Sequence, residues 1–180
     1  MLSRVARFED LDESVLDGFT CGDVWMDGWL ANKASRQLKS GLCAMHVGLD
    51  EDGLPIGFFT LATCQVMPTD VLKKERHGYN RMPFGALLIG ELAVRADLRG
   101  SGLGYGVQLL NHAIFIACNI SHDAGVAFIV VDPLGGNEHI CRWYQHNGFV
   151  ASPGGSRHYM PIRKARERID ALGEDYFRFD

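Results

Sequence analysis

The sequence lacks the features of a membrane, secreted or metal-binding protein. Its five cysteines are an odd number without a paired spacing, which favours reduced thiols over a disulfide framework. No Cys-x-x-Cys or His-x-x-x-His pattern indicates a metal site, and no apolar run approaches the roughly 20 residues that span a bilayer. The N-terminus has no charged-then-apolar signal segment. We therefore expect a cytoplasmic protein that binds neither a metal ion nor a membrane.

An excess of positive charge is also missing. The formal net charge is −4, which argues against binding a polyanion over the whole surface but leaves room for a local basic patch. We see no internal repeat and no low-complexity tract. A chain of 180 residues with 47% apolar content suffices for one domain with a substantial core. We predict that domain over residues 1–162, followed by a charged and partly amphipathic tail over 163–180.

The most informative stretch runs from residue 86 to residue 110. An apolar run over 86–94 predicts a buried strand. The glycines Gly100, Gly102 and Gly104 then lead into a segment with apolar residues at helical spacing. These apolar residues are Leu103, Val107, Leu110 and Ile114. The first N–H groups of a helix lack intrahelical partners, and the helix dipole favours negative charge there. A strand, a glycine turn and a helix in this order predict an anion site.

The remaining segments predict an α/β fold. Asp23 is a candidate N-cap for a helix that runs to about residue 38. Further along, the pattern predicts a hairpin over 42–50 and 57–66, a strand over 125–132, a short helix over 138–146, and a final hairpin over 149–151 and 158–161. Early strands followed by alternating strands and helices favour a mixed sheet with helices on both faces.

The series Arg99-x-x-Gly102-x-Gly104, placed just after Leu92-Ala93-Val94, resembles the acyl-CoA signature of the GNAT acetyltransferase superfamily. The resemblance implies a GNAT fold of the α/β (α+β) class, with a mostly antiparallel mixed sheet whose central strands splay. It also implies acetyl-CoA as co-substrate. In that family the loop amides hold the CoA pyrophosphate and the preceding strand binds the pantetheine arm. Carried over, the cofactor-binding residues are Leu92, Ala93, Val94, Arg99, Gly100, Ser101, Gly102, Leu103 and Gly104.

A second match follows the next predicted strand. Asn137, Tyr144 and Gly148-Phe149 resemble the Asn-x6-Tyr-x3-Gly-Phe element of the superfamily. The resemblance implies that Tyr144 is the general acid for the CoA thiolate, since a phenol with a pKa near 10 is protonated at neutral pH. It also implies that Asn137 binds the pantetheine arm, although a cap for the helix at 138–146 explains Asn137 almost as well.

A third match resembles one particular branch of the superfamily. Phe19-x-Cys21-Gly22 followed by Trp29-Leu30 resembles the opening of toxin-type GNAT enzymes, which form toxin–antitoxin pairs and acetylate the α-amino group of aminoacyl-tRNA. Met82-Pro83 resembles the same branch. The resemblance implies an antitoxin partner and an aminoacyl-tRNA acceptor held by a basic patch, and a homodimer is a further expectation. The candidates for the patch are Lys33, Arg36, Lys39, Lys73, Lys74, Arg76 and Arg157.

Glu91 departs from the toxin pattern, which usually has a basic residue there. A carboxylate disfavours a nearby phosphate and favours a cationic amine. The alternative is therefore a GNAT enzyme that acetylates a small amine, a protein N-terminus or a lysine, with Glu91 as the catalytic base. A third hypothesis is a non-catalytic acyl-CoA sensor. The Arg99–Gly104 signature together with Tyr144 favours an enzyme over the sensor.

Overall fold

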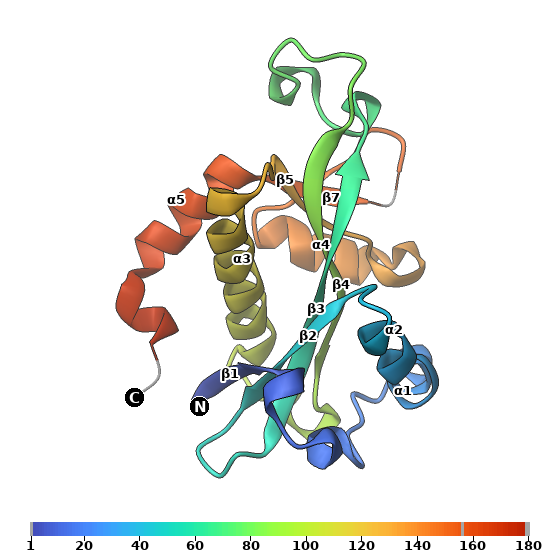
Figure 1. The fold of residues 1–180 in the computed structure, drawn as a ribbon, viewed down its shortest axis with the longest axis vertical. Coiled ribbons are helices and arrows are strands. Elements are labelled where there is room, and N and C mark those ends of the chain that lie inside the picture. Colours follow the sequence, from blue (N-terminus) through green and yellow to red (C-terminus); the bar gives the residue numbers. More distant parts are fainter. Residues whose placement is uncertain (1, 156, 179–180) are drawn as a thin grey trace. The chain divides into compact units, whose positions relative to one another are not determined.

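The computed structural model describes residues 2–155 and 157–178, and its strands form a seven-stranded sheet in the order β1-β2-β3-β4-β5-β7-β6 (Figure 1). Strands β4 and β5 are parallel, whereas the pairs β1–β2, β2–β3, β5–β7 and β6–β7 are antiparallel. This confirms the predicted mixed and mostly antiparallel sheet. The strands are β1 (Arg4–Arg7), β2 (Ala44–Leu49), β3 (Pro55–Val66), β4 (Phe84–Val94), β5 (Phe128–Val131), β6 (Val150–Ala151) and β7 (His158–Pro161).

The helices begin and end close to the predicted positions, with one exception. The first helical stretch is capped by Asp23, as predicted, and contains a π-helical turn at Leu30–Ala34. The exception is the long helix, which begins at Tyr105, so Leu103 is exposed ahead of it and the helical role predicted for Leu103 was wrong. The helices are α1 (Val24–Trp29), α2 (Ser35–Lys39), α3 (Tyr105–Asp123), α4 (Glu138–His146) and α5 (Ile162–Leu172).

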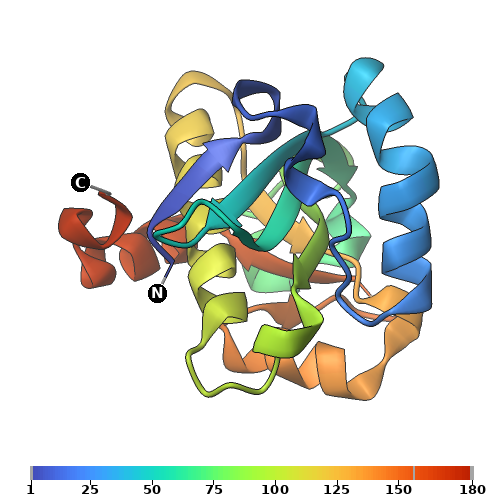
Figure 2. The same cartoon turned by 90° about the horizontal axis from the view of Figure 1, so that it is seen from below.

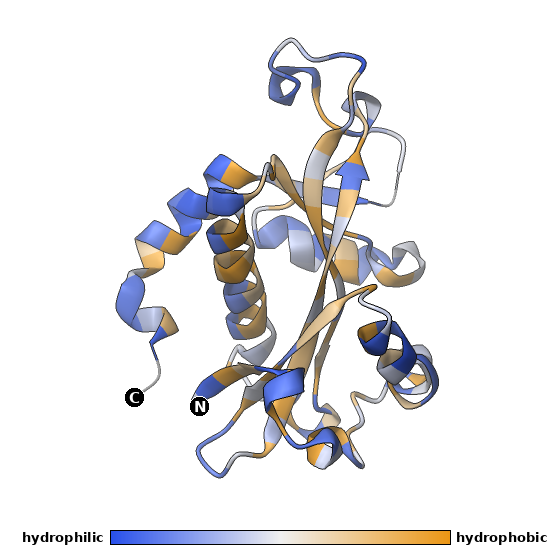
Figure 3. Ribbon diagram, viewed as in Figure 1, coloured by the Kyte–Doolittle hydropathy of each residue, from blue (hydrophilic) through white to orange (hydrophobic). Residues whose placement is uncertain are grey.

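The chain folds into two compact units. The first unit comprises residues 2–62, 90–113 and 178, and the second comprises residues 63–89 and 114–177, within the described part of the chain. Figure 3 shows apolar residues along the strands and along α3, whereas α5 alternates between polar and apolar positions. In the part of the chain that the structure describes, no helix is both long and apolar enough to cross a membrane.

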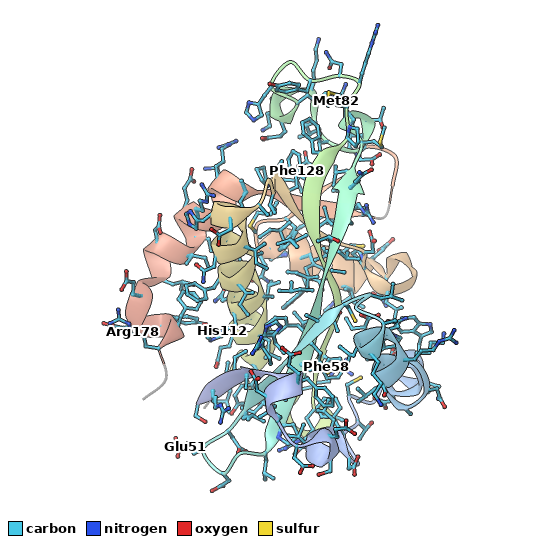
Figure 4. All side chains as sticks on the ribbon, in the orientation of Figure 1. Glu51, Phe58, Met82, His112, Phe128 and Arg178 are labelled. Carbon is cyan, nitrogen blue, oxygen red and sulfur yellow. The ribbon has the colours of Figure 1, made fainter. Side chains whose placement is uncertain are left out.

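In the first unit, helices cover both faces of β2. Alternate residues of a strand point to opposite faces. Val47 and its odd-numbered neighbours belong to the apolar core that also holds Trp29 and Phe58, and Phe58 is completely buried (Figure 4). On the opposite face, a Cβ on Gly48 would lie 2.7 Å from a methyl carbon of Leu109 in α3. A side chain there would force the completely buried Leu109 side chain to move, so the present packing depends on glycine.

The second unit has its own apolar core around β5 and β7. Phe128 packs edge-on against Phe84 and Tyr159, at ring-centroid distances of 5.4 and 5.5 Å. The helix predicted in the tail is present as α5, and its Ala165 is fully buried. Arg166 of α5 donates to the Ser121 hydroxyl over 2.7 Å. The second unit therefore includes most of the tail, which the sequence analysis had set apart.

Candidate functional site

The turn ahead of α3, residues 99–104, is hereafter the glycine loop. Gly100, Gly102 and Gly104 have φ angles of 72°, 78° and 68°, a left-handed conformation that L side chains rarely adopt. A Cβ built on any of the three would meet nothing within 4 Å. All residues of the loop are exposed, and Figure 2 shows it projecting outward at the beginning of α3. The glycines are therefore required by the backbone conformation and leave open space beside it.

The glycine loop presents backbone donors that the described residues do not use. The amides of Arg99, Ser101 and Leu103 donate to local acceptors. Five other N–H groups of this stretch have no acceptor among the described residues, those of Gly100, Gly102, Gly104, Tyr105 and Gly106. Exposed N–H groups at the start of a helix of this length form a concentrated region of positive potential. This arrangement is suited to a phosphate or diphosphate group.

The base of the glycine loop is held by the segment that contains Phe19, Cys21 and Gly22. Arg99 donates from Nη1 to the Cys21 carbonyl oxygen over 2.7 Å. Ala96 donates its N–H to the Thr20 carbonyl oxygen over 2.9 Å. The sequence analysis assigned Arg99 to CoA binding, and the structure places this nitrogen of its guanidinium on protein instead.

The half of β4 that precedes the glycine loop extends beyond its pairing with β5. The β4–β5 register ends at Ile89 opposite Val131. The predicted pantetheine-binding residues Leu92, Ala93 and Val94 follow that last pair. A Cβ on Gly57 of β3 would lie 2.2 Å from the Ala93 carbonyl oxygen, so β3 and β4 approach closely here. The end of the parallel pairing is what the predicted splay of the central strands requires.

Glu91 is paired with a hydroxyl that the sequence analysis did not identify. Thr60, only 1% exposed, donates its hydroxyl to Oε2 of Glu91 over 2.7 Å. The same hydroxyl oxygen accepts the Glu91 N–H over 2.9 Å. The bond orients one carboxylate oxygen and leaves the other, Oε1, without a partner among the described residues. A carboxylate fixed in this way can bind an ammonium group or accept a proton.

Tyr144 lies on α4 in the second unit and is 7% exposed. Its ring packs edge-on against Trp143 and Phe149, at centroid distances of 4.9 and 5.5 Å. Burial raises the pKa of Tyr144 above the ordinary value for a phenol, so the hydroxyl stays protonated across the physiological range. None of the described residues forms a hydrogen bond with this hydroxyl, and its oxygen is not completely buried. The proton is therefore available to an external group.

Both ends of α4 are well capped. The Asn137 side-chain oxygen accepts the N–H groups of His139 and Ile140, over 2.9 and 3.3 Å. Asn137 therefore acts as the N-cap that the sequence analysis gave as its alternative role. At the other end, Arg168 of α5 donates from Nη1 to the Asn147 carbonyl oxygen over 2.7 Å and from Nη2 to its side-chain oxygen over 3.2 Å. These contacts fix the helix that carries Tyr144.

The basic residues proposed for a patch differ in whether they form ion pairs or hydrogen bonds with other described residues. Five of them are exposed and form no ion pair with other described residues: Lys33, Arg36, Lys39, Lys73 and Lys74. Arg157 is instead paired with Asp132, with an Nη2–Oδ2 distance of 2.6 Å. Arg76 donates from Nε and Nη2 to the Val71 carbonyl oxygen. The available positive charge is therefore concentrated on α2 and its preceding turn and at Lys73 and Lys74.

Sequence reasoning missed two polar residues that organise these groups. Thr60 holds Glu91, as described above. Asp27 of α1 accepts the Thr20 hydroxyl and the Cys21 N–H, over 2.6 and 2.9 Å. None of these residue types has a diagnostic spacing, because their roles depend on contacts between segments distant in sequence or on side-chain direction. By contrast, the Asp23 and Asn137 caps, which are contacts within four residues, had a local signal.

The structural comparisons agree on one fold. No known protein-family model matches the chain. A mutant of KacT superimposes with a TM-score of 0.81 at 18% identity, covering 92% of this chain and 98% of KacT. AtaT complexed with acetyl-methionyl-tRNAfMet superimposes with a TM-score of 0.80 at 19% identity, covering 92% and 98%. A mutant AtaT toxin bound to the antitoxin AtaR C-terminus and acetyl-CoA gives 0.73 at 18%, covering 92% and 96%. The chain has the GNAT fold predicted from its sequence, in the form found in KacT and the AtaT toxin.

Proposed function

We propose that this protein is an acetyl-CoA-dependent N-acetyltransferase of the toxin type, which acetylates the α-amino group of aminoacyl-tRNA and so blocks translation. The observation that carries the proposal is the glycine loop, whose exposed N–H groups have no acceptor among the described residues and point to a diphosphate ligand. The likeness to AtaT, which has been captured with acetyl-CoA and with acetyl-methionyl-tRNAfMet, supports both the donor and the acceptor.

The binding step follows from the charge of the ligand. CoA carries a diphosphate, and hydrogen bonds from N–H groups to a charged acceptor are worth about 1.5–3 kcal/mol each. The left-handed glycines remove the side chains that would block approach to the backbone. In this proposal the amides of Gly100, Gly102 and Gly104 bind the diphosphate, and Leu92, Ala93 and Val94 bind the pantetheine arm.

The proposed chemistry assigns one proton to Tyr144. Transfer of the acetyl group forms a C–N bond to the acceptor amine and breaks the thioester C–S bond. The departing thiolate gains the Tyr144 proton, and the proton that the amine loses restores the phenol, directly or through water, so no net proton is released. A buried phenol is suited to this role because it keeps its proton at neutral pH, so the proton is present when the thiolate departs.

The acceptor and the partner follow from charge and from the comparisons. Unpaired basic side chains on α2 and its preceding turn are suited to phosphates of an RNA backbone, and their contribution will weaken as salt rises. An antitoxin partner is proposed because the AtaT toxin has been captured bound to the C-terminus of AtaR. A homodimer, and a cytoplasmic location beside the translation machinery, complete the proposal.

The test is thiol release by the purified protein from acetyl-CoA, with total aminoacyl-tRNA as acceptor. We expect stoichiometric acetyl-aminoacyl-tRNA and free thiol, with none when uncharged tRNA or N-formylated methionyl-tRNA replaces the charged pool. Expression in growing cells should arrest translation. Absence of thiol release, together with unchanged growth under strong expression, would overturn the proposal.

A second acceptor class is favoured by the Thr60–Glu91 pair. Glu91 has one carboxylate oxygen fixed by a buried hydroxyl and the other unpartnered among the described residues, which suits an ammonium group. In this alternative Glu91 is the base that receives the amine proton, and the acceptor is a small amine, a protein N-terminus or a lysine. A panel of such amines should then support turnover while charged tRNA does not, and Glu91→Gln should remove most of that turnover. Binding of acetyl-CoA without transfer to any acceptor would instead indicate a sensor.

A further inference from the structure

We infer that Asp27 is a positioning residue for acetyl-CoA binding, because it holds the segment at Thr20 and Cys21 that in turn anchors the base of the glycine loop. The inference rests on the proposed function, since it concerns how the loop is set to receive the diphosphate. Asp27 lies in α1, far from the glycine loop in sequence, and nothing in the comparisons assigns it a role.

The first layer of contacts joins Asp27 to two consecutive residues. Its Oδ2 accepts the Thr20 hydroxyl over 2.6 Å, and its Oδ1 accepts the Cys21 N–H over 2.9 Å. The hydrogen bond from Thr20 lowers the pKa of Asp27 below the ordinary value, so the carboxylate is ionised at neutral pH. Both oxygens of one charged group therefore fix the direction of the chain at Thr20 and Cys21.

The second layer joins the same two residues to the base of the glycine loop. The Thr20 carbonyl oxygen accepts the Ala96 N–H over 2.9 Å, and the Cys21 carbonyl oxygen accepts Nη1 of Arg99 over 2.7 Å. Each residue thus faces Asp27 with a donor and the loop with an acceptor. Gly22 completes the arrangement with a φ of 77°, and a Cβ there would already touch the Ala96 methyl at 3.5 Å.

The polar contacts are distinct from the packing that anchors this segment. Phe19 lies edge-on to Phe58 and Trp29 stacks on Phe58, at ring-centroid distances of 5.4 and 6.1 Å. These apolar contacts do not involve Asp27, so we expect the first unit to keep its fold when the carboxylate is removed. Loss of the carboxylate should instead change the direction of the Thr20 and Cys21 carbonyl groups and, through them, the alignment of the glycine-loop amides. Misalignment of about 1 Å is enough to cost a large factor in a pre-organised site.

The experiment compares Asp27→Ala with Asp23→Ala. Both remove an aspartate that hydrogen-bonds near the start of α1, but the Asp23 carboxylate accepts the Met26 N–H and not the Thr20 hydroxyl or the Cys21 N–H. We expect Asp27→Ala to raise the Kd for acetyl-CoA about tenfold, measured by calorimetry, with kcat at saturating acetyl-CoA within about twofold of the wild-type value. Its kcat/KM for acetyl-pantetheine, which has no diphosphate, should be unchanged. Asp27→Asn should restore part of the affinity.

The outcomes separate the inference from the proposed function. If the wild-type protein does not bind acetyl-CoA, both are overturned. If it binds and Asp27→Ala has the affinity of Asp23→Ala, only the inference is overturned. A parallel loss of activity with acetyl-pantetheine would likewise count against it, because that substrate does not reach the glycine loop. Thr20→Val, which removes the hydroxyl without removing bulk, provides the same test should Asp27→Ala fold poorly, and the same tenfold rise is expected.

Discussion

The glycine loop and the helix that carries Tyr144 treat their backbone polar groups in opposite ways. The amides of Gly100, Gly102 and Gly104 have no acceptor among the described residues, and the loop is exposed. Helix α4 has its first free amides bound by Asn137 and its C-terminal end bound by Arg168. On the same helix, the hydroxyl of Tyr144 has no hydrogen-bond partner among the described residues, and its ring is 7% exposed.

The difference indicates that the glycine loop and α4 have different functions. A group that binds a large, charged and exchangeable ligand gains from many open donors, because each bond to the ligand replaces one to water. A group that gives up one proton gains from a rigid setting in which no neighbour competes for that proton. Open amides at the loop, and on α4 a buried hydroxyl without a partner among the described residues, are therefore consistent with ligand binding at the first and proton transfer at the second.

The largest expected effect comes from Tyr144→Phe. Removing the Tyr144 hydroxyl should lower kcat at least a hundredfold, the usual scale for loss of a general acid, while the KM for acetyl-CoA stays within about twofold. Steady-state thiol release measures both constants. Tyr159→Phe is the matched control, because its hydroxyl accepts the Leu72 N–H over 3.0 Å and serves the fold. That variant should lose about 1 kcal/mol of stability and keep its kcat. A Tyr144→Phe protein with near-normal kcat would mean that the hydroxyl on α4 does not supply the proton.

The next effect concerns acid stability of the first unit. Burial, with a smaller contribution from Arg7, lowers the pKa of His46 from 6.5 to about 4. Since the folded-state pKa is the lower one, the unfolded state binds the extra proton, and stability falls as pH decreases from about 6.5 towards 4. From pH 7 to pH 5 the loss from this one group is about 2 kcal/mol.

His46→Phe tests this directly. The His46 ring stacks on Phe59 at a centroid distance of 5.1 Å, and its Nδ1 has no partner among the described residues. A phenyl ring keeps the stacking and removes the titrating group, so denaturant midpoints at pH 7 and pH 5 should differ less in the variant. His112 on α3 (Figure 4), whose pKa is lowered to about 4 by burial, should retain a second share of the acid sensitivity. An identical pH slope in the variant and the wild type would contradict the assignment.

The sequence predicted the elements better than the contacts between them. Apolar runs and caps located β4, the first hairpin and α4 because those signals are local. The glycine pattern predicted an anion site, which stays a prediction, and the exposed Leu103 shows that its apolar side chain was misread as part of the helix. Arg99 was assigned to the ligand, because a sequence pattern does not reveal that a guanidinium nitrogen is occupied by the Cys21 carbonyl.

A moderate effect is expected from Gly102→Ala, paired with Gly53→Ala. Both glycines belong to the first unit, both have a φ of 78°, and a Cβ on either meets nothing within 4 Å. The conformational cost of a left-handed alanine is therefore the same, about 1 kcal/mol, and should appear equally in their denaturation midpoints. Only Gly102→Ala places a methyl group beside the open amides, so only this variant should raise the KM for acetyl-CoA, by about tenfold. Equal KM values in the two variants would mean that the glycine loop does not bind the diphosphate.

The smallest expected effect tests whether the capping of α4 matters for Tyr144. Arg168→Ala and Lys164→Ala both remove a cation from α5, but they differ in what the cation contacts. Lys164 forms an exposed ion pair with Glu167, whereas Arg168 binds the carbonyl and side-chain oxygens of Asn147 at the end of α4. An exposed pair contributes little, so Lys164→Ala should behave as wild type within about 0.5 kcal/mol. Loss of the bonds to Asn147 should cost about 1–2 kcal/mol and loosen the last turn of α4. We therefore expect kcat to fall about threefold in Arg168→Ala with no change in the KM for acetyl-CoA. A change in that KM instead would mean that the end of α4 influences ligand binding. Ligand binding could then no longer be assigned to the glycine loop alone.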